Sequence, residues 1–390
     1  MRLGVYSDLS YRSDGERLST HQAFVRFVTS LPPRVDEVVL FGRLDPEPGR
    51  SHYLLPDEGV RFVALPHYPK VTALAGQARA LRRTLAVFRR ELDNVDAVWI
   101  FGPHPIALAL AIEARRRRKP LVLGVRQDYA RYIGHRLPSR RWFWAVPVAH
   151  ALDAAFRLLA RRSPTIAVGD ALAERYRHGA APTLSTGFSL ITARELASPA
   201  DSLGRSWDGP LRLLTVGRID AEKNPLLLPE IVRLLHERDP RWRLAVVGDG
   251  PLLPELERRV TELGLENAVE LRGYVPNGEA LWREYHGSHA FLHVSLTEGL
   301  PQVLVEAQAA GLPIVATDVG GVAAAVGGGR SALLVPPDDA AAAATALQRL
   351  AAEPELRRRL IEESLAAAAR ETLEAQLDRI AAFIRSSLAR

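Results

Sequence analysis

Short apolar runs alternate with longer amphipathic stretches along the whole chain. The first half contains the runs LGVYSD, DEVVLFGR, DAVWIFG and PLVLGVRQD, and the second half contains LRLLTVGR, WRLAVVGDG and HAFLHVS. Short strands separated by helices are typical of a parallel sheet built from strand–helix–strand units. The pattern therefore predicts an α/β fold with two doubly wound parallel-sheet domains.

The length of 390 residues also favours two domains. Residues 198–210, SPADSLGRSWDGP, lack apolar periodicity and are predicted to be a linker. We expect an acceptor-binding domain over residues 1–200 and a second domain over 205–370, with a helix at about 371–390 packing back on the first domain. Two such domains facing each other would form a cleft, and ligands of open parallel sheets bind beyond the carboxyl ends of the strands.

The composition, 47% hydrophobic and 25% charged, is that of a soluble globular protein. The chain has no cysteine, which excludes thiolate catalysis, cysteine metal sites and disulfide bonds. The sequence contains no long apolar stretch of the kind that spans a bilayer, and its N-terminus lacks the pattern of a signal peptide. We therefore expect a cytoplasmic protein.

Positive charge is concentrated in the first half. Residues 1–205 hold 31 Lys and Arg against 19 Asp and Glu, whereas residues 206–390 hold 20 against 26. A basic half suggests an anionic partner, such as nucleic acid, phospholipid or a phosphorylated substrate, although a general bias toward arginine explains the counts equally well. Nucleic acid is disfavoured because no recognition module joins the basic residues.

Two basic segments also carry aromatic side chains. EARRRRKP (113–120) is followed by residues 135–162, where arginines stand beside Trp142, Phe143 and Trp144. This mixture suits peripheral association with an anionic membrane, and a lipid-linked acceptor would fit such a location. A buried helix with solvated arginines is the alternative interpretation.

Two loops that follow strands of the second half contain glycines and cations. In VGRIDAEKNP, Gly217 allows a tight turn, and Arg218 and Lys223 place two cations on the connection to a helix, in the manner of a phosphate clamp. An ordinary solvated loop has the same composition. In VGDGP, Gly248 and Gly250 would let the backbone approach a ligand, or they only form a turn.

The stretch LTEGLPQVLVEAQAAGLPIVATD at 296–318 predicts a short helix followed by a strand. Pro301 suits the first turn of that helix. The backbone amides at this helix start, those of Gly299, Leu300 and the residues that follow Pro301, would therefore attract a diphosphate. Glu298 precedes the helix and would reach sugar hydroxyls. Glu306 lies two turns further on, where it would bind a ribose or simply face solvent.

Residues 211–337 resemble the nucleotide-sugar-binding domain of retaining glycosyltransferases of family 4, which have two Rossmann-like domains in the GT-B arrangement. The matching segments are VGRIDAEKNP, VVGDGPLLPELE, LRGYV, the E-x7-E pair in TEGLPQVLVEAQAAGLPIVATDVGG, and ALLVPPDD. The resemblance implies transfer of a hexose-type sugar from a UDP or GDP sugar, with retention of configuration and without a metal or other cofactor. The acceptor would be lipid-linked, a polysaccharide or a small molecule.

The resemblance also implies roles for individual residues. Arg218 and Lys223 would neutralise the diphosphate, and Glu298 would be catalytic, holding the transferred sugar together with the amides of Gly299, Leu300 and Pro301. Glu306 would bind the ribose. The other donor-binding residues that it implies are Gly217, Gly248, Gly250, Arg272, Tyr274 and Val275.

The first half departs from the family pattern. The glycine-rich loop after the first strand is reduced to Gly15, and the strand end at VRQDYARY has no histidine. Arg126 or Asp128 would substitute for that histidine, or His104 would approach from the neighbouring strand. His286, His289 and His293 lie close together in sequence, but we expect no metal site.

Three other functions remain as alternatives. A nucleotide-sugar epimerase on the same two-domain frame would release an altered sugar without an acceptor. A relative that has lost catalysis would bind a sugar nucleotide without turnover, and a two-domain binding protein would close on its ligand without chemistry.

Overall fold

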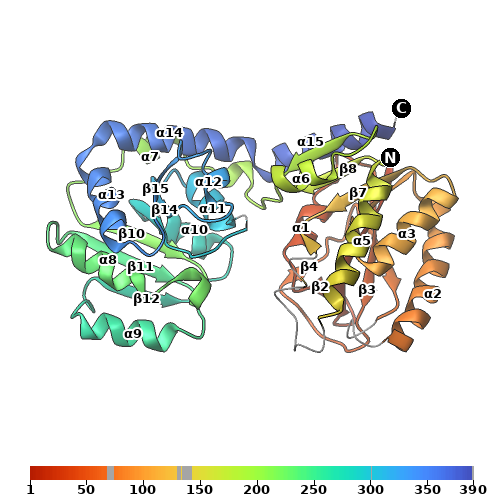
Figure 1. The fold of residues 1–390 in the computed structure, drawn as a ribbon, viewed down its shortest axis with the longest axis horizontal. Helices are drawn as coiled ribbons and strands as arrows, with labels where there is room; N and C mark the ends of the chain where they lie inside the picture. Colours follow the sequence, from red (N-terminus) through yellow and green to blue (C-terminus); the bar gives the residue numbers. More distant parts are fainter. Residues whose placement is uncertain (68–73, 130–132, 134–142, 300, 389–390) are drawn as a thin grey trace. The chain divides into compact units, whose positions relative to one another are not determined.

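The computed structural model describes residues 1–67, 74–129, 133, 143–299 and 301–388. It divides into two compact units, each described here by itself. Unit 1 comprises Met1–Leu190 and Leu373–Arg390, and unit 2 comprises Ile191–Thr372. Each unit is built on a largely parallel sheet covered by helices on both faces, in agreement with the predicted α/β fold (Figure 1).

The described residues of unit 1 form nine strands in one sheet. Its strands are β1 (Arg2–Ser13), β2 (Leu18–Thr20), β3 (Glu37–Leu44), β4 (Tyr53–Leu54), β5 (Val60–Leu65), β6 (Ala97–Gly102), β7 (Leu121–Val125), β8 (Thr165–Val168) and β9 (Thr183–Thr186). The parallel part has the order β5-β3-β1-β6-β7-β8-β9, and β2 and β4 extend β1 as antiparallel strands. Its helices are α1 (Phe24–Thr29), α2 (Leu74–Glu91), η1 (Leu92–Asn94), α3 (Pro105–Arg116), α5 (Ala145–Ala160), α6 (Asp170–Tyr176) and α15 (Leu373–Leu388).

The helices of unit 1 cover the two faces of its sheet with separate cores. On one face, α2, α3, α5 and α6 contribute Phe88, Leu110 and Phe156 to one cluster. On the other face, α1 and α15 pack around Trp99 with Phe27 and Ile380. Fully buried aromatic side chains therefore anchor each layer, since they remove the most apolar surface from water.

Unit 2 carries a six-stranded parallel sheet. Its strands are β10 (Leu211–Val216), β11 (Trp242–Val247), β12 (Val269–Gly273), β13 (Ala290–His293), β14 (Ile314–Thr317) and β15 (Ala332–Val335), in the order β12-β11-β10-β13-β14-β15. Its helices are η3 (Ala193–Glu195), α7 (Pro199–Leu203), η4 (Ala221–Lys223), α8 (Leu227–His236), α9 (Leu253–Glu262), α10 (Glu279–His286), α11 (Gln302–Ala309), α12 (Val322–Ala325), α13 (Ala340–Ala352) and α14 (Pro354–Arg370).

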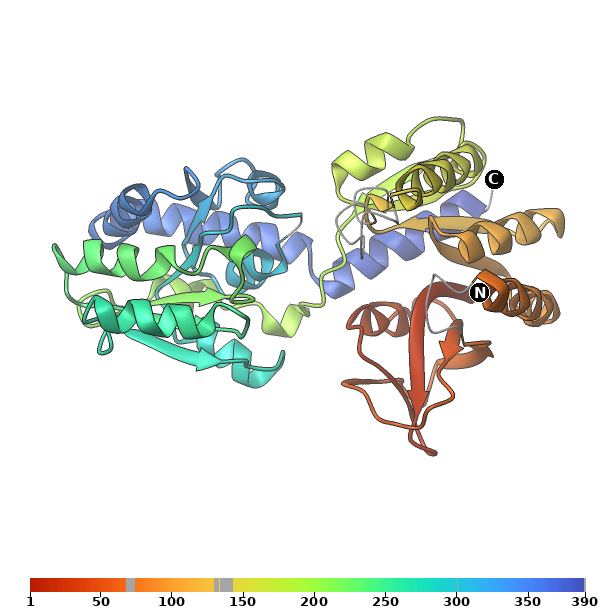
Figure 2. The same ribbon diagram turned by 60° about the horizontal axis from the view of Figure 1, so that its bottom comes forward.

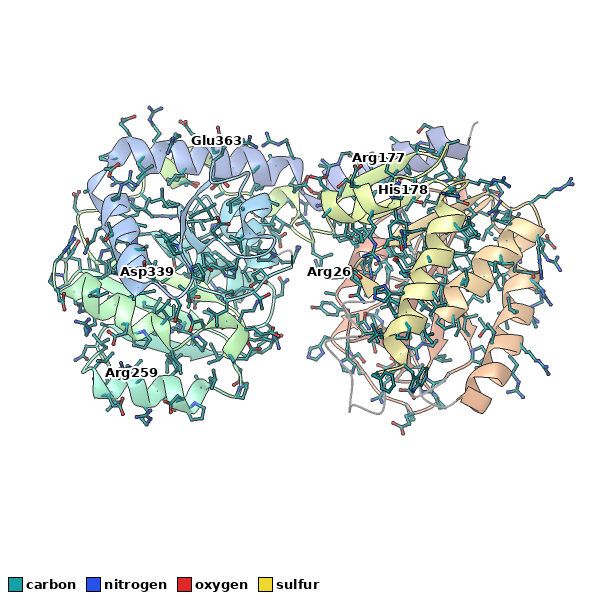
Figure 3. The ribbon with its side chains drawn as sticks, in the orientation of Figure 1. Arg26, Arg177, His178, Arg259, Asp339 and Glu363 are labelled. Carbon is teal, nitrogen blue, oxygen red and sulfur yellow. The ribbon has the colours of Figure 1, made fainter. Side chains whose placement is uncertain are left out.

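Alternation along the strands of unit 2 directs side chains to two helix layers. Leu213 faces the core formed with α8, α9 and α13, whereas Leu214 faces α10, α11 and α12. Polar contacts complete the layers: Arg259 of α9 donates to Glu230 of α8 (Nη2 to Oε1, 2.8 Å), and Asp339 caps α13 (Figure 3). The strand order brings the carboxyl ends of β10, β11 and β13 together, and the predicted site lies there.

The segment 198–210, predicted to be a linker, contains the helix α7 within unit 2 instead. Ser198 caps that helix by accepting a hydrogen bond from the Asp201 amide (3.2 Å), and Pro199 occupies its first turn. The Ser and Pro that suggested a linker are thus helix-start residues. The chain passes from unit 1 to unit 2 earlier, at Leu190–Ile191, and returns to unit 1 at Leu373, where α15 begins.

Within the described part of the chain, no helix combines the length and apolar character that crossing a bilayer requires.

Candidate active site

Two loops of unit 2 meet backbone to backbone where β10 and β11 end. The Gly217 amide donates to the Val247 carbonyl (3.0 Å). Gly248 has a φ of +152°, and a Cβ atom at this position would lie 1.8 Å from the carbonyl oxygen of Gly217. Gly250 approaches Ile219 in the same way. These glycines therefore allow the two loops to pack against each other, and contact with a donor stays a prediction for all three.

Glu298 lies at the centre of a polar cluster beyond the end of β13. Its Oε1 atom contacts the Lys223 ammonium, accepts a hydrogen bond from Ser295 Oγ (2.9 Å) and lies 3.0 Å from His293 Nε2. Burial alone would raise the pKa of Glu298, but His293 and Lys223 outweigh it and lower the pKa to about 2. The Glu298 side chain is therefore a fixed anion at neutral pH.

Backbone contacts also hold Glu298 in place. The Leu296 amide donates to the Glu222 carbonyl (2.9 Å), which joins the loop after β13 to the loop after β10. The Gly321 amide donates to the Glu298 carbonyl (3.2 Å), and a Cβ atom on Gly320 would lie 2.0 Å from that carbonyl oxygen. Three loops thus converge on this carboxylate.

Arg218 and Lys223 line one small cavity of about 20 Å³, together with Gly217, His293 and Ser295. Lys223 is turned toward Glu298, as described above. Arg218 is 68% exposed and pairs with Asp220 (2.8 Å) and Glu222 (3.1 Å) of its own loop. The predicted clamp therefore has both cations at one cavity, with each of them occupied by carboxylates.

The start of α11 has the predicted form. The helix begins at Gln302, Pro301 lies at its N-cap, and no side chain caps this end. Gly299 is exposed just before it, and Leu300 lies outside the described residues. The N-terminal end of α11 is thus available to an anion through its backbone amides.

Glu306 is half-buried on α11 and is not the solvent-facing residue of the alternative interpretation. The Tyr285 hydroxyl donates to Glu306 Oε2 (2.7 Å). Burial raises the pKa of Glu306, the Tyr285 hydrogen bond opposes this, and nearby Glu195 adds to it. A desolvated carboxylate with one hydroxyl donor retains acceptor capacity for a ligand hydroxyl.

The predicted donor-binding residues Arg272, Tyr274 and Val275 lie at or just after β12, the edge strand of the sheet. Arg272 is paired with Glu284 (Nη2 to Oε1, 2.8 Å) and Glu270 (2.6 Å), Tyr274 is exposed, and Val275 is half-buried against the core. Arg272 and Val275 line a groove of about 630 Å³.

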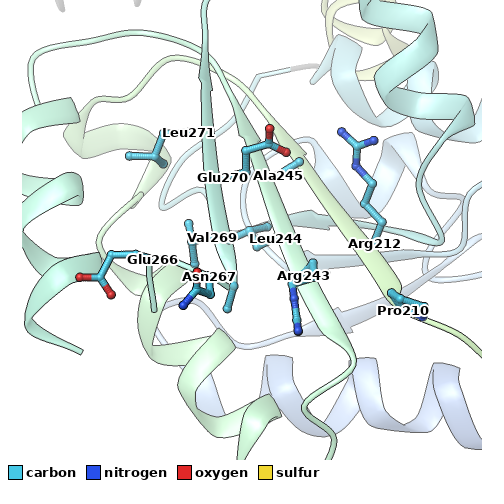
Figure 4. Close-up of a pocket in the computed structure, with 11 residues that line it drawn as sticks. Pro210, Arg212, Arg243, Leu244, Ala245, Glu266, Asn267, Val269, Glu270 and Leu271 are labelled. Atoms are coloured by element: carbon cyan, nitrogen blue, oxygen red, sulfur yellow. The ribbon is translucent and has the colours of Figure 1, made fainter. Parts of the chain in front are cut away.

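Another groove of about 630 Å³ lies near the amino ends of β10, β11 and β12. Pro210, Arg243 and Asn267 are among its lining residues (Figure 4). None of the predicted site residues lines it, and it lies at the opposite end of the strands from Glu298.

In unit 1, His104 and Arg126 each follow a strand at its carboxyl end. His104 is half-buried and caps α3, accepting from the Ala107 amide (3.4 Å), and desolvation lowers its pKa. Its Nε2 atom has no hydrogen-bond partner among the described residues. The Arg126 guanidinium lies 4.2 Å above the ring of Phe24. Both residues are at the edge where an acceptor is expected.

Asp128 and Gly15 have local roles. Asp128 accepts a hydrogen bond from Arg175 Nη1 (2.6 Å), and the same guanidinium donates to the buried Asp153 (2.7 Å). Gly15 lies in the turn between β1 and β2 with a φ of +102°.

The three clustered histidines have separate surroundings. His286 stacks on Trp282, and His289 accepts a hydrogen bond from the Arg212 amide (3.0 Å), while His293 faces Glu298. In the ranges that the structure describes, no three His, Cys, Asp or Glu side chains meet as metal ligands would.

The sequence analysis did not assign three of the side chains described above to the site. His293 and Ser295 contact Glu298, and Tyr285 contacts Glu306. The sequence pointed only weakly to His293, through the interruption of the apolar run of a buried strand by a polar residue. Nothing in the sequence pointed to Tyr285, because its contact with Glu306 joins two helices across the fold.

Residues 205–366 match the family described as Glycosyl transferases group 1. The gpi3 subunit of phosphatidylinositol N-acetylglucosaminyltransferase from Schizosaccharomyces pombe is 34% identical over 112 residues, which is 29% of this chain and 24% of that protein. The sulfoquinovosyl transferase SQD2 of Arabidopsis thaliana is 25% identical over 318 residues, which is 77% of this chain and 56% of that protein.

One of the similar solved structures is HepE of Anabaena in complex with UDP. It superimposes with a TM-score of 0.69 at 18% identity, over 99% of this chain and 100% of HepE. This likeness over the whole chain confirms the predicted GT-B fold class. The family match falls within unit 2, around the cluster of Lys223, Glu298 and His293. Residues 205–366 are therefore similar to the glycosyl transferases group 1 family, and the residues outside this range are not part of the match.

Proposed function

We propose that the protein is a retaining glycosyltransferase that moves a hexose-type sugar from a nucleotide diphosphate sugar to a lipid-linked, polysaccharide or small-molecule acceptor. The observation that carries this proposal is the cluster at the end of β13, where Lys223 and Arg218 line one cavity and Glu298 is held against Lys223. This cluster falls inside the residues that match the glycosyl transferases group 1 family. The names of two relatives, both sugar transferases, support the same reaction class.

The charges of this cluster suit the bond that would break. The bond between the anomeric carbon and the diphosphate oxygen breaks, and its electron pair leaves with the diphosphate. The anomeric carbon then bonds to an acceptor hydroxyl oxygen, whose proton is transferred to the leaving diphosphate or to solvent. Arg218 and Lys223 would stabilise the negative charge that develops on the leaving diphosphate, because preorganised cations stabilise charge that appears in the transition state. We expect them to replace a metal ion in this role.

The remaining roles follow from the positions of the carboxylates. Glu298 would exchange its contact with Lys223 for hydroxyl groups of the transferred sugar, while the open N-terminus of α11 binds a phosphate. Glu306 would accept hydrogen bonds from the ribose beside the Tyr285 hydroxyl. UDP is the preferred nucleotide of this proposal because HepE was solved with UDP, and GDP is the next candidate.

Calorimetric titration with UDP, GDP, ADP and dTDP tests the donor assignment. We expect one of them to bind, and we expect Lys223→Ala to weaken that binding and to lower transfer from the matching sugar nucleotide by about 100-fold or more. Arg238→Ala, on an exposed arginine that bonds only Gln348 among the described residues, serves as the control. NMR of the product's anomeric configuration tests retention. Absence of binding by every nucleotide, or full turnover in Lys223→Ala, would contradict the proposal.

A further inference from the structure

The outer surface of one helix layer of unit 1 has an unusual distribution of charge. The layer consists of α5, α3 and α2, which lie side by side in this order on one face of the sheet (Figures 1 and 2). Each of these helices has one glutamate or aspartate among its described side chains: Glu91 in α2, Glu113 in α3 and Asp153 in α5. The position of these three acids decides the charge of the surface.

All three acids are turned away from solvent and paired. Glu91 accepts from Arg61 (2.8 Å), and Glu113 accepts from Arg89 of α2 (Nε to Oε1, 2.8 Å). Asp153 is 2% exposed and accepts from the Tyr176 hydroxyl (2.6 Å). The outward side of these helices therefore presents no unpaired carboxylate in the part that the structure describes. One acid, Asp93, is exposed just beyond the C-terminus of α2.

Arginines occupy the same outward surface. The exposed ones on these helices and just beyond their C-termini, for which no carboxylate partner occurs among the described residues, are Arg82, Arg83, Arg90, Arg115, Arg116, Arg118, Arg161 and Arg162. Their positive charge is not cancelled locally, so the surface attracts anions over the Debye length of about 8 to 10 Å in physiological salt.

Large apolar side chains are exposed on the same surface. Of the eight large hydrophobic side chains that are exposed in the described part of the chain, Ile112 belongs to α3, Val148 and Leu158 belong to α5, and Phe143 and Trp144 directly precede α5. Phe143 is 71% exposed and Leu158 is 63% exposed. Trp144, Val148 and Leu158 follow helical spacing along α5, so they form a stripe on its outer side.

We propose that this surface, the outward side of α5, α3 and α2, docks on an anionic lipid bilayer. Exposed aromatic and aliphatic side chains insert at the headgroup boundary, and the arginines bind lipid phosphates beside them. The pairing of the three acids within these helices reduces the repulsion that would oppose such binding, and Asp93 is outnumbered by the exposed arginines. This inference stands on the surface alone and does not depend on the proposed sugar transfer.

Charge complementarity selects the bilayer over other occupants. A second copy of this surface would bring arginines against arginines, which repel each other across a symmetric interface. Nucleic acid would engage the arginines but would leave the aliphatic stripe of Val148 and Leu158 in water. Only a partner that is anionic and apolar at once satisfies both parts of the surface.

Sedimentation of the full chain with vesicles tests the proposal. We expect binding to phosphatidylcholine vesicles that contain phosphatidylglycerol and little binding to phosphatidylcholine alone. Arg82→Gln combined with Arg83→Gln should weaken binding on the order of fivefold for each arginine, and this loss should shrink at high salt. Val148→Ser combined with Leu158→Ser should weaken binding at high salt as well, because it removes the apolar contact.

The control is Arg283→Gln combined with Arg359→Gln, which makes the same charge change on exposed helix positions of unit 2. It should bind vesicles like the unchanged chain. Circular dichroism and nucleotide titration of every variant show whether the fold and the donor site are intact, so loss of docking is distinguished from loss of the proposed transfer.

Four outcomes would overturn the proposal. These are no sedimentation of the unchanged chain with anionic vesicles, an equal loss in the unit 2 control, binding of RNA in place of vesicles, and a dimer in solution that Val148→Ser with Leu158→Ser dissociates while vesicle binding is absent.

Discussion

Two glutamates eight residues apart have opposite electrostatic environments. Glu298 is held by a lysine and lies beside a histidine, and its pKa is lowered to about 2. Glu306 is desolvated with one hydroxyl donor, and its pKa is raised. Carboxylates whose pKa values are pushed apart are typical of functional sites, where each has a different task. Here the first is suited to a fixed charge and the second to a hydrogen-bond acceptor.

The lowered pKa of Glu298 predicts an acid-sensitive contribution to stability. Because the folded pKa lies below the unfolded value near 4.5, the contribution is complete above about pH 4.5 and is lost as the pH falls toward about 2. After allowance for solvent screening we expect about 1–2 kcal/mol. Urea unfolding across this range should give a steeper pH dependence for the unchanged chain than for Glu298→Gln. Identical slopes would contradict the assignment.

The raised pKa of Glu306 predicts the opposite effect on stability. A carboxyl group with a folded pKa above its unfolded value has no effect on stability below about pH 4.5. It destabilises the fold progressively as the pH rises above that value, and fully once the pH exceeds the folded pKa. Glu306→Gln should therefore raise the free energy of unfolding at neutral pH by about 1 kcal/mol, while it weakens nucleotide binding. Thermal unfolding and calorimetry measure the two effects. A less stable variant with normal binding would refute the prediction.

At the residue scale, the sequence predicted which residue types gather at the strand ends better than it predicted their contacts. Lys223 and Glu298 were both named, yet their pairing with each other was not foreseen. His293 was considered only as a metal ligand, because a side chain on a strand and a residue in the following loop meet only when the loop folds back. Such contacts depend on loop geometry, which apolar periodicity does not encode.

At the scale of elements, periodicity predicted most of the strands and several helix boundaries. The short helix and the strand expected within 296–318 are α11 and β14, and the helix expected at about 371–390 is α15. The prediction that residues 198–210 form a linker was wrong, because a helix of five residues has too few turns to show an apolar period. Capping residues without periodicity were read as loop residues.

The packing of the β10 and β11 loops predicts a large effect of one methyl group. Gly248→Ala would place a Cβ atom against the Gly217 carbonyl, so we expect a loss of about 2–4 kcal/mol and weaker nucleotide binding. Gly264→Ala is the matched control, because Gly264 also has a positive φ but has open space around it. It should cost about 1 kcal/mol. Chemical unfolding compares the two, and equal losses would mean that backbone strain alone is responsible.

At the scale of the whole molecule, the chain leaves unit 1 at Leu190 and returns to it with α15. Ile380 is fully buried in the core that contains Trp99. Ile380→Ala should therefore lower the stability of unit 1 by about 2–5 kcal/mol and leave unit 2 unchanged. Calorimetric unfolding should show one transition shifted and one retained, whereas Ala382→Ser, at an exposed position of the same helix, should shift neither. A parallel shift of both transitions would show that the units do not unfold separately.

The discontinuity of unit 1 also has a consequence for synthesis on the ribosome. All of unit 2 emerges from the exit tunnel before α15, the helix that completes unit 1, is available. During that interval the nascent chain displays the apolar sheet face around Trp99 and Phe27 to solvent or to a chaperone. The first-made half of the protein therefore acquires its full core only after residues 373–388 have been synthesised.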